Sequence, residues 1–368
     1  MGLLKFDFCQ KRGSFRIACC VFRSLTQHAI RFHNSQIEEK SVMDIVCTDE
    51  SSDGVSERQI VEAAGLTFAF RPCRTPAELV EASREARALL VGLLPLPGDL
   101  LRQRPELKLI VACSTGWDHI DLAAATELGI LVCNAGDYCA DEVADHTLLL
   151  LLAAWRKLPL LTAEVRQGGW NFDCAGAPRP LKDTVLGIMG VGRIGSRVAQ
   201  RAKAFGLRVI GYDPFVPPDQ IAARGLEPAS LPELLAQAEI ISLHLPSQTD
   251  KQPVLGQAAF AQMRPGALLI NVSRADLVDM AAARAALESG QLSGLALDVW
   301  ATEPPAALDP LFDHPQVIVT PHAAWYSTHS VRALHQRTAE EAVRVLGGQP
   351  PRFGINRPQT PRLPHLKI

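Results

Sequence analysis

An arginine, a glutamate and a histidine each follow an apolar run in the second half of the chain. Arg274 comes after ALLINVS, Glu303 after LALDV, and His322 after VIVT. A guanidinium can hold a carboxylate and a carbonyl oxygen with its planar fork, and an imidazole beside a carboxylate can give or take a proton near neutral pH. Each residue also has an ordinary interpretation: a surface ion pair, an acid in a proline-rich turn, and a hydrogen-bonded histidine.

The elements around these three residues predict that they lie together. Between residues 184 and 322, six apolar runs alternate with helix patterns, which is typical of a doubly wound parallel sheet. Ligands bind beyond the carboxyl ends of the strands in such a sheet. Any one of these residues could follow a strand by chance. That all three follow strands of one sheet by chance is much less easily explained.

A glycine-rich loop opens the same segment. Gly190, Gly192 and Gly195 form G-x-G-x-x-G between a strand and a helix, and Asp213 ends the next strand. In the dinucleotide-binding turn, the first glycine allows the tight turn, the second admits a pyrophosphate and the third lets helix and strand pack closely. Asp213 can bind both ribose hydroxyls and would repel a 2′-phosphate, so we expect NAD rather than NADP. An ordinary glycine turn is the alternative.

The preceding residues predict a second, smaller α/β domain over 43–141. Apolar strand runs alternate there with helices, one of which has Thr75 as its cap and Pro76 at its first position. A long helix is expected over 141–167, with a kink or interruption at Pro159. It is apolar around much of its circumference, which is typical of a helix buried between domains or in a subunit contact, and it predicts a homodimer.

Composition bounds the remaining possibilities. The 368 residues suggest two domains, and the net charge of −2 does not indicate nucleic acid or an anionic membrane as a partner. The longest apolar run of the body, residues 148–155, is much shorter than the about 20 residues that a membrane span needs. Nine cysteines without C-x-x-C spacing predict reduced thiols in a cytoplasmic protein and indicate no metal site.

The two ends of the chain differ from its body. Residues 1–42 are basic and poor in acids. We expect an unstructured extension there, and an organelle transit peptide is the alternative. Residues 348–368 are rich in proline and arginine and predict an extended tail.

Four segments resemble the signature segments of the D-isomer-specific 2-hydroxyacid dehydrogenases. They are GIMGVGRIGSRVAQRAKAFGLRVIGYDP, LLINVSRADLVD, GLALDVWATEPP and VTPHAAWYS, and the likeness extends over about residues 43–345. The His-Ala-Ala-Trp-Tyr run is most similar to the C-terminal binding protein-like branch. The resemblance implies two Rossmann-like doubly wound parallel-sheet domains with a cleft between them. One is a substrate domain over 43–141, completed by about 324–347, and the other is an NAD-binding domain over 142–323.

The resemblance assigns Arg274, Glu303 and His322 as the catalytic set of an NAD-dependent 2-oxoacid reductase. Arg274 would hold the carboxylate and ketone of the substrate, and His322 would donate a proton to the ketone oxygen while Glu303 favours the charged ring. Glu303 also argues against formate, whose oxidation has no such proton to move. The residues implied for the cofactor are Gly190, Gly192, Arg193, Ile194, Gly195, Asp213, Leu245, Pro246, Thr249, Val272, Ser273, Arg274, Asp298, His322 and Ala324.

The loop CSTGWDHID is expected to meet the substrate. Its small residues Ser114, Thr115 and Gly116 leave backbone N–H groups available to a carboxylate. The loop is also compatible with a plain strand-to-helix turn in which Asp118 is the helix cap. Trp325, three residues after His322, is expected either to touch the substrate or only to pack.

Two questions stay open in the sequence. Family members usually have glycine where Ala275 stands, and alanine would strain the backbone there if that position needs a positive φ. Members of the C-terminal binding protein branch act as NAD-sensing scaffolds in transcriptional repression, so a binding protein with weak or vestigial catalysis is the second hypothesis. The resemblance implies a small 2-oxo or 2-hydroxy acid as substrate without identifying which one.

Overall fold

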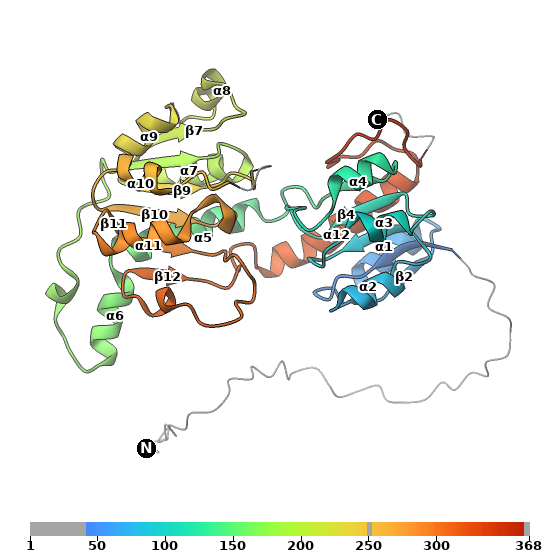
Figure 1. Ribbon diagram of the computed structural model, residues 1–368, viewed down its shortest axis with the longest axis horizontal. Coiled ribbons are helices and arrows are strands. Elements are labelled where there is room, and N and C mark those ends of the chain that lie inside the picture. Colours follow the sequence, from blue (N-terminus) through green and yellow to red (C-terminus); the bar gives the residue numbers. More distant parts are fainter. Residues whose placement is uncertain (1–41, 249–251, 364–368) are drawn as a thin grey trace, which may run out of the picture. The chain divides into compact units, whose positions relative to one another are not determined.

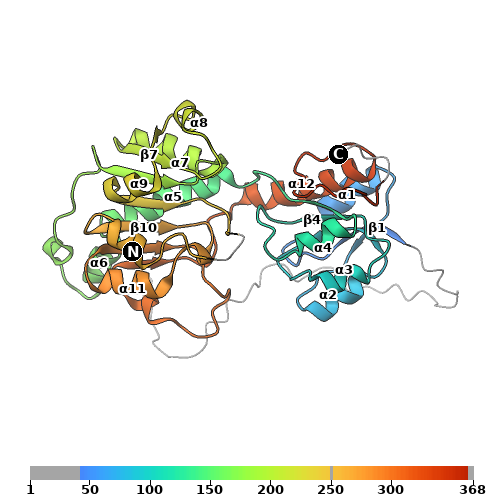
Figure 2. The same cartoon turned by 45° about the horizontal axis from the view of Figure 1, so that its top comes forward.

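The computed structural model describes residues 42–248 and 252–363 and contains two parallel β-sheets flanked by helices (Figure 1 and Figure 2). These sheets confirm the expected α/β class with two Rossmann-like domains. Of the expected extension over 1–42, only Val42 lies within the described residues. Thr249, expected at the cofactor, also lies outside them.

The first sheet has five parallel strands in the order β2-β1-β3-β4-β5, a flavodoxin-like order. Its strands are β1 (Met43–Cys47), β2 (Phe68–Phe70), β3 (Ala86–Val91), β4 (Leu109–Ala112) and β5 (Leu131–Cys133). The intervening helices are α1 (Val55–Ala63), α2 (Pro76–Ala82), α3 (Gly98–Arg102) and α4 (Leu122–Glu127). As expected, Thr75 caps α2, and its hydroxyl accepts the Glu78 N–H at 3.2 Å.

The second sheet has seven parallel strands in the order β12-β11-β10-β9-β6-β7-β8. They are β6 (Val185–Met189), β7 (Arg208–Tyr212), β8 (Glu227–Pro228), β9 (Ile240–Leu243), β10 (Ala267–Asn271), β11 (Leu292–Leu297) and β12 (Val317–Val319). Six of these strands were expected. The seventh, β8, pairs only with β7 at the edge of the sheet and has two exposed residues, which are too few to form a hydrophobic pattern.

The helices of this second part are α5 (Ala140–Trp155), α6 (Leu158–Arg166), α7 (Arg193–Ala204), α8 (Pro218–Ala223), α9 (Leu231–Gln237), α10 (Gln257–Gln262) and α11 (Met280–Glu288), with short 3₁₀ turns η1 (Phe172–Ala175), η2 (Ala275–Leu277) and η3 (Pro310–Asp313). Among these helices, α7, α9, α10 and α11 were expected, whereas α8 was not.

Strand residues of the second sheet alternate between two hydrophobic clusters. Ile240, Leu268 and Ile270 belong to a cluster that includes residues of α5 and α7, whereas Ile241 and Leu269 belong to one with residues of α9, α10 and α11. Successive side chains of a strand point to opposite faces of the sheet. Helices therefore cover both faces (Figure 1), which explains why the strands are nearly continuous apolar runs.

The apolar stretch expected as one long helix forms two. Between α5 and α6 lie Arg156 and Lys157, and Lys157 has a positive φ of 56°. Pro159 stands in the first turn of α6, where its missing N–H loses no intrahelical hydrogen bond. The expected interruption is therefore present, but it comes two residues before the proline.

The last helix, α12 (Thr328–Leu346), packs on α1, β3 and β4 of the first sheet. A buried ion pair joins α12 to α1, with His335 Nδ1 3.1 Å from Glu57 Oε1. Burial opposes both charges, but their mutual attraction outweighs it, so that the pKa of Glu57 is lowered and the pKa of His335 is raised. The tail then returns to β5, where the Ile355 N–H donates to the Val132 carbonyl at 2.8 Å.

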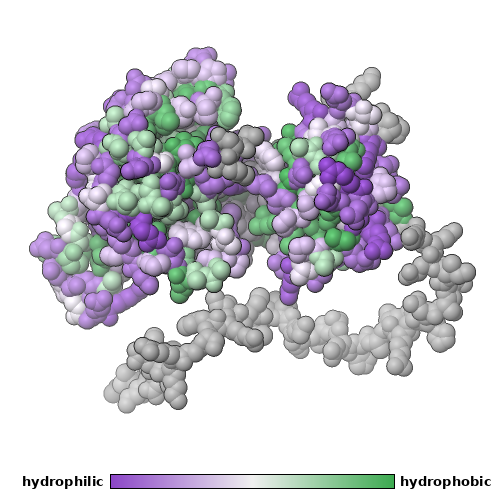
Figure 3. All heavy atoms as spheres, viewed as in Figure 1, coloured by the Kyte–Doolittle hydropathy of each residue, from purple (hydrophilic) through white to green (hydrophobic). Residues whose placement is uncertain are grey.

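Hydrophobic and hydrophilic residues are interspersed over the face of the molecule in Figure 3. Two aromatic side chains that follow α6 are strongly exposed: Trp170 is 90% and Phe172 is 81% accessible. Within the described ranges, none of the helices has the length and apolar character needed to cross a bilayer.

Candidate active site

The side chains of His322 and Glu303 are hydrogen-bonded beyond the carboxyl ends of β12 and β11. His322 Nδ1 lies 2.6 Å from Glu303 Oε2, and the Trp300 N–H donates to the other oxygen of Glu303 at 2.7 Å. Burial raises the pKa of Glu303, but these two hydrogen bonds and the positive charge of Arg274 outweigh burial, so the pKa is lowered. The carboxylate therefore stays ionised beside the ring. Because Nδ1 is engaged, Nε2 is the ring nitrogen that can exchange a proton with a ligand.

Arg274 lies beyond β10 and is held by its own loop. The buried side chain of Asn271 donates to the Arg274 carbonyl at 2.7 Å and accepts the Ser273 N–H at 3.0 Å. Arg274 Nη1 donates to the Ser273 carbonyl at 2.8 Å. The next residue, Ala275, begins η2 and does not have a positive φ. Alanine at this position therefore adds no backbone strain, which answers the question that the sequence left open.

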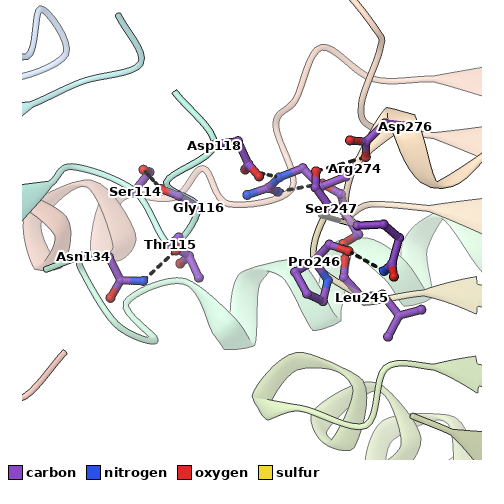
Figure 4. Close-up of polar contacts among 12 residues, drawn as sticks. Ser114, Thr115, Gly116, Asp118, Asn134, Leu245, Pro246, Ser247, Arg274 and Asp276 are labelled. Carbon is purple, nitrogen blue, oxygen red and sulfur yellow. Dashed lines mark hydrogen bonds and ion pairs between the residues drawn. The ribbon is translucent and has the colours of Figure 1, made fainter. Parts of the chain in front are cut away.

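Figure 4 shows Arg274 against the loop that follows β4. Arg274 Nε donates to Asp118 Oδ2 at 2.8 Å. A Cβ on Gly116 would lie 1.8 Å from Arg274 Nη2, so the guanidinium fills the space that a side chain at position 116 would need. The helix cap considered for Asp118 is wrong: α4 is capped by Asp121, whose side chain accepts the Ala124 N–H at 3.0 Å. The fold thus brings Arg274 to the loop expected to meet the substrate.

That loop is braced through its hydroxyl and carbonyl groups. Ser114 Oγ donates to the Gly116 carbonyl at 2.6 Å, and Thr115 Oγ1 donates to the Gly136 carbonyl at 3.1 Å. The Asn134 side chain donates to the Thr115 carbonyl at 2.6 Å (Figure 4). Among the described residues, the backbone N–H groups of Thr115 and Gly116 donate to no other residue. They are therefore available to an anionic ligand.

The three glycines after β6 have surroundings that fit their expected roles. Gly190 has a φ of 97°, and a Cβ there would lie 2.5 Å from the His244 carbonyl. A Cβ on Gly195 would lie 2.1 Å from the Gly190 oxygen, whereas one on Gly192 would meet nothing within 4 Å. Arg193 and Ile194 then form the first turn of α7. Open space thus lies beside Gly192 at the positive end of this helix, where the diphosphate is expected.

Asp213 follows β7 and supports the glycine loop. Its Oδ2 accepts the Val191 N–H at 2.8 Å, and its Oδ1 accepts the Phe215 N–H at 2.9 Å. A carboxylate has about four acceptor positions, so each oxygen retains one for a ribose hydroxyl. The Arg224 guanidinium donates to the carbonyl of the same residue, Val191. Asp213 therefore lies beside the loop as expected, and its contact with ribose stays a prediction.

The other residues expected at the cofactor lie beyond the carboxyl ends of β9 to β12. They are Leu245 and Pro246, Val272 and Ser273, Asp298, and Ala324. Ser273 Oγ donates to the Leu245 carbonyl, which joins two adjacent strand ends. The carboxylate of Asp298 is buried and accepts the Ala324 N–H at 2.9 Å. The structure places these residues along one edge of the sheet, and their cofactor contacts stay a prediction.

Trp325 is half-buried among aromatic side chains. Its ring centroid lies 6.2 Å from that of Tyr138 and 5.4 Å from that of Tyr326, both in edge-on geometry. Tyr326 itself is 69% exposed. The packing role considered for Trp325 is therefore present, and a contact with the substrate stays a prediction.

Sequence patterns did not single out two polar residues that brace the site. Asn271 directly precedes the Arg274 loop, and an amide at the end of a buried strand was a visible signal. His146 on α5 has its Nε2 3.1 Å from Thr320 Oγ1, 174 positions away in the chain. No local pattern indicates such a contact, because the fold alone brings the two segments together.

Comparison with known proteins agrees with this geometry. Residues 148–324 match the family model described as "D-isomer specific 2-hydroxyacid dehydrogenase, NAD binding domain", which confirms the expectation of NAD. The D-3-phosphoglycerate dehydrogenase of Mycobacterium tuberculosis is 38% identical over 273 residues, 74% of this chain and 51% of that protein. The chain thus spans about half the length of this relative.

A shorter relative and a solved structure extend the likeness. The glycerate dehydrogenase of Methylorubrum extorquens is 34% identical over 290 residues, 75% of this chain and 88% of the relative. The structure of D-lactate dehydrogenase from Aquifex aeolicus, complexed with NAD and lactic acid, is 29% identical with a TM-score of 0.74, covering 83% of this chain and 95% of that one. These relatives do not show the expected C-terminal binding protein-like branch.

The glycine loop generates a paired prediction. Gly195→Ala is expected to lower the free energy of unfolding by about 1–3 kcal/mol, because its Cβ meets the Gly190 carbonyl. Gly192→Ala should leave that free energy nearly unchanged and weaken NADH binding, because its methyl group enters the space left for the diphosphate. Denaturant unfolding and NADH fluorescence titration measure the two effects. Parent-like NADH affinity in Gly192→Ala would contradict this position for the diphosphate.

Proposed function

The chain belongs to the D-isomer-specific 2-hydroxyacid dehydrogenase family, and from this premise we propose that it is an NAD-dependent reductase of a small 2-oxo acid. The product is the D-2-hydroxy acid, and the reverse reaction is the oxidation of that acid. The observation that carries this proposal is the 2.6 Å contact between His322 and Glu303 on the same sheet as the glycine loop. An imidazole paired in this way is suited to general acid–base catalysis.

Proton transfer is assigned to His322. Glu303, whose pKa is lowered, stays ionised and holds Nδ1 of the ring. In reduction, Nε2 gives its proton to the ketone oxygen as negative charge develops there. In oxidation, Nε2 takes the proton of the hydroxyl group. Bound NADH supplies the hydride that adds to C2 of the oxo acid.

Substrate binding is assigned to Arg274 and the loop after β4. The guanidinium fork presents several donors to the carboxylate and ketone oxygen of a 2-oxo acid. The available N–H groups of Thr115 and Gly116 add uncharged donors beside it. Because Asp118 holds Nε, the guanidinium is oriented before the substrate arrives. Trp325 is proposed to form a wall of the substrate pocket.

Coenzyme binding is assigned to the glycine loop and the adjoining strand ends. Gly192 admits the diphosphate, and Asp213 binds the ribose hydroxyls and disfavours a 2′-phosphate. The buried Asp298 accepts one N–H at Oδ2 and keeps acceptor capacity there for an amide group of the coenzyme.

A homodimer is also proposed. None of the side chains of α6 is buried within the chain, although the helix includes Leu158 and Val165, which are 50% and 52% exposed. Leu149 on α5, Trp170 and Phe172 are exposed as well. Apolar side chains gathered on one segment are typical of a surface covered by a partner, and a second copy of this chain is the proposed partner.

A cytoplasmic location is the last part of the proposal. Burial raises the pKa of the Cys47, Cys113 and Cys133 thiols and keeps them protonated. Reduced thiols of this kind fit a compartment that does not form disulfides. Recovery of the protein from a purified organelle fraction would contradict this assignment.

The central prediction is turnover of NADH with a 2-oxo acid. The parent protein is assayed at 340 nm with glyoxylate, pyruvate, hydroxypyruvate and phosphohydroxypyruvate, beside Arg274→Ala, Arg274→Lys and the surface control Arg58→Ala. We expect turnover on at least one acid, a loss of about 10²- to 10³-fold in kcat/KM for Arg274→Ala, and little effect of the control. NADH binding without turnover on any acid would instead favour the scaffold hypothesis.

A second prediction concerns the pH profile of reduction. Glu303→Gln removes the carboxylate charge that faces His322 Nδ1, so the loss of activity with rising pH should begin at a lower pH. Initial rates from pH 5 to 9 measure this shift. Glu227→Gln, which removes a carboxylate paired with Arg208 far along the sheet, is the matched control. An unchanged profile in Glu303→Gln would remove Glu303 from its role.

The homodimer prediction is tested by mass. Light scattering at micromolar concentration is expected to give twice the chain mass, and Trp170→Asp with Phe172→Asp should shift the protein toward monomer, because the charges oppose burial. A parent protein that is monomeric under these conditions would contradict the dimer.

A further inference from the structure

A buried carboxylate organises the turn that carries His322. Asp298 follows β11 and is 1% exposed. Its Oδ1 accepts from the Thr320 hydroxyl and from the Ala323 N–H at 2.8 Å, and its Oδ2 accepts the Ala324 N–H at 2.9 Å. The Asp298 carbonyl also accepts the His322 N–H at 2.8 Å. The residue that follows β11 thus binds four of the five residues from Thr320 to Ala324.

The turn needs this support because of its backbone conformation. His322 has a φ of 51°, in the left-handed region that residues with a Cβ rarely adopt. Such a conformation persists only where surrounding contacts determine it. The hydrogen bonds to Asp298 on both sides of His322 are the contacts that do so.

His146 on α5 extends this arrangement by one hydrogen bond. A hydroxyl has a single proton, and Thr320 gives it to the Asp298 carboxylate, which can only accept. The Thr320 oxygen must therefore accept from His146 Nε2, 3.1 Å away. This contact requires a proton on Nε2 of His146. The same nitrogen lies 3.6 Å from Asp298 Oδ1, so it also faces the buried charge.

We propose that His146, Thr320 and Asp298 form a directed hydrogen-bond chain that positions His322 for proton transfer. The chain runs from His146 to Thr320 to the Asp298 carboxylate, and that carboxylate holds the turn on which the imidazole stands. Glu303 orients the imidazole ring, and the hydrogen-bond chain fixes the backbone of the turn that carries it. The inference rests on the proposed function for its effect on rate, but the positioning of His322 can be measured without it.

Two pairs of variants of the full-length protein test this hydrogen-bond chain. Thr320→Val removes the hydroxyl at constant shape, and Thr320→Ser restores it. His146→Leu removes the donor, and His146→Gln offers an N–H in its place. Thr320→Val and His146→Leu are expected to lower kcat by about 10- to 100-fold, as for a misplaced catalytic group, with KM for NADH within about twofold of the parent. Thr320→Ser and His146→Gln should recover most of the loss.

A second readout separates this proposal from the proposed function. The NMR titration of the His322 ring, assigned by comparison with His322→Gln, reports the surroundings of the imidazole whether or not turnover occurs. We expect its midpoint to differ from the parent in Thr320→Val and to return in Thr320→Ser. If the parent protein shows no turnover, the proposed function is overturned, but the titration still tests whether the hydrogen-bond chain positions His322.

Two results would overturn the positioning chain. One is a kcat and a midpoint of the His322 NMR titration that both match the parent in Thr320→Val and in His146→Leu. The other is a loss of kcat that the conservative variants do not restore, or that comes with an equal loss of NADH affinity, because either pattern indicates general destabilisation instead of positioning.

Discussion

The parallel direction of every strand in the second sheet is the constraint on which the rest of the site depends. Because β9, β10, β11 and β12 are neighbours and run the same way, the residues after them emerge side by side. Arg274, Asp298 and His322 therefore share one edge with the glycine loop, although they are far apart in the chain. Apolar side chains on both faces hold this register, since slipping one residue would turn each of them to the opposite face.

Two pairs of polar side chains face each other at this edge. Glu303 faces His322, and Arg274 faces Asp118. Partly buried charges are costly to leave unpaired, and a paired charge also has a defined direction. Polar contacts farther back, from Asn271 to the Arg274 loop and from Asp298 to the His322 turn, restrict the backbone beneath these side chains. These contacts thus give the side chains defined directions, and fixed direction is the condition for efficient transition-state stabilisation.

The relatives differ in the acid that their names specify, whereas the roles proposed for the arginine, glutamate and histidine are the same for every 2-oxo acid. A fold supports many related activities, and the substrate is selected by the residues around the reacting centre. In this chain, Trp325 and Tyr326 lie three and four residues after the histidine, and Arg274 contacts Asp118 of the loop after β4. In the proposed function, these residues would select the substrate by the part of the molecule beyond C2.

The sequence by itself determined the α/β class, the glycine turn and the strand ends that carry Arg274, Glu303 and His322, because hydrophobic periodicity and glycine spacing are local properties. It did not indicate the two-residue strand β8, or that the long helix breaks at Lys157 before Pro159. Only the tertiary structure decided that Asp118 pairs with Arg274 and His146 with Thr320, across 156 and 174 positions. Such contacts depend on how distant segments pack, and no local pattern records that.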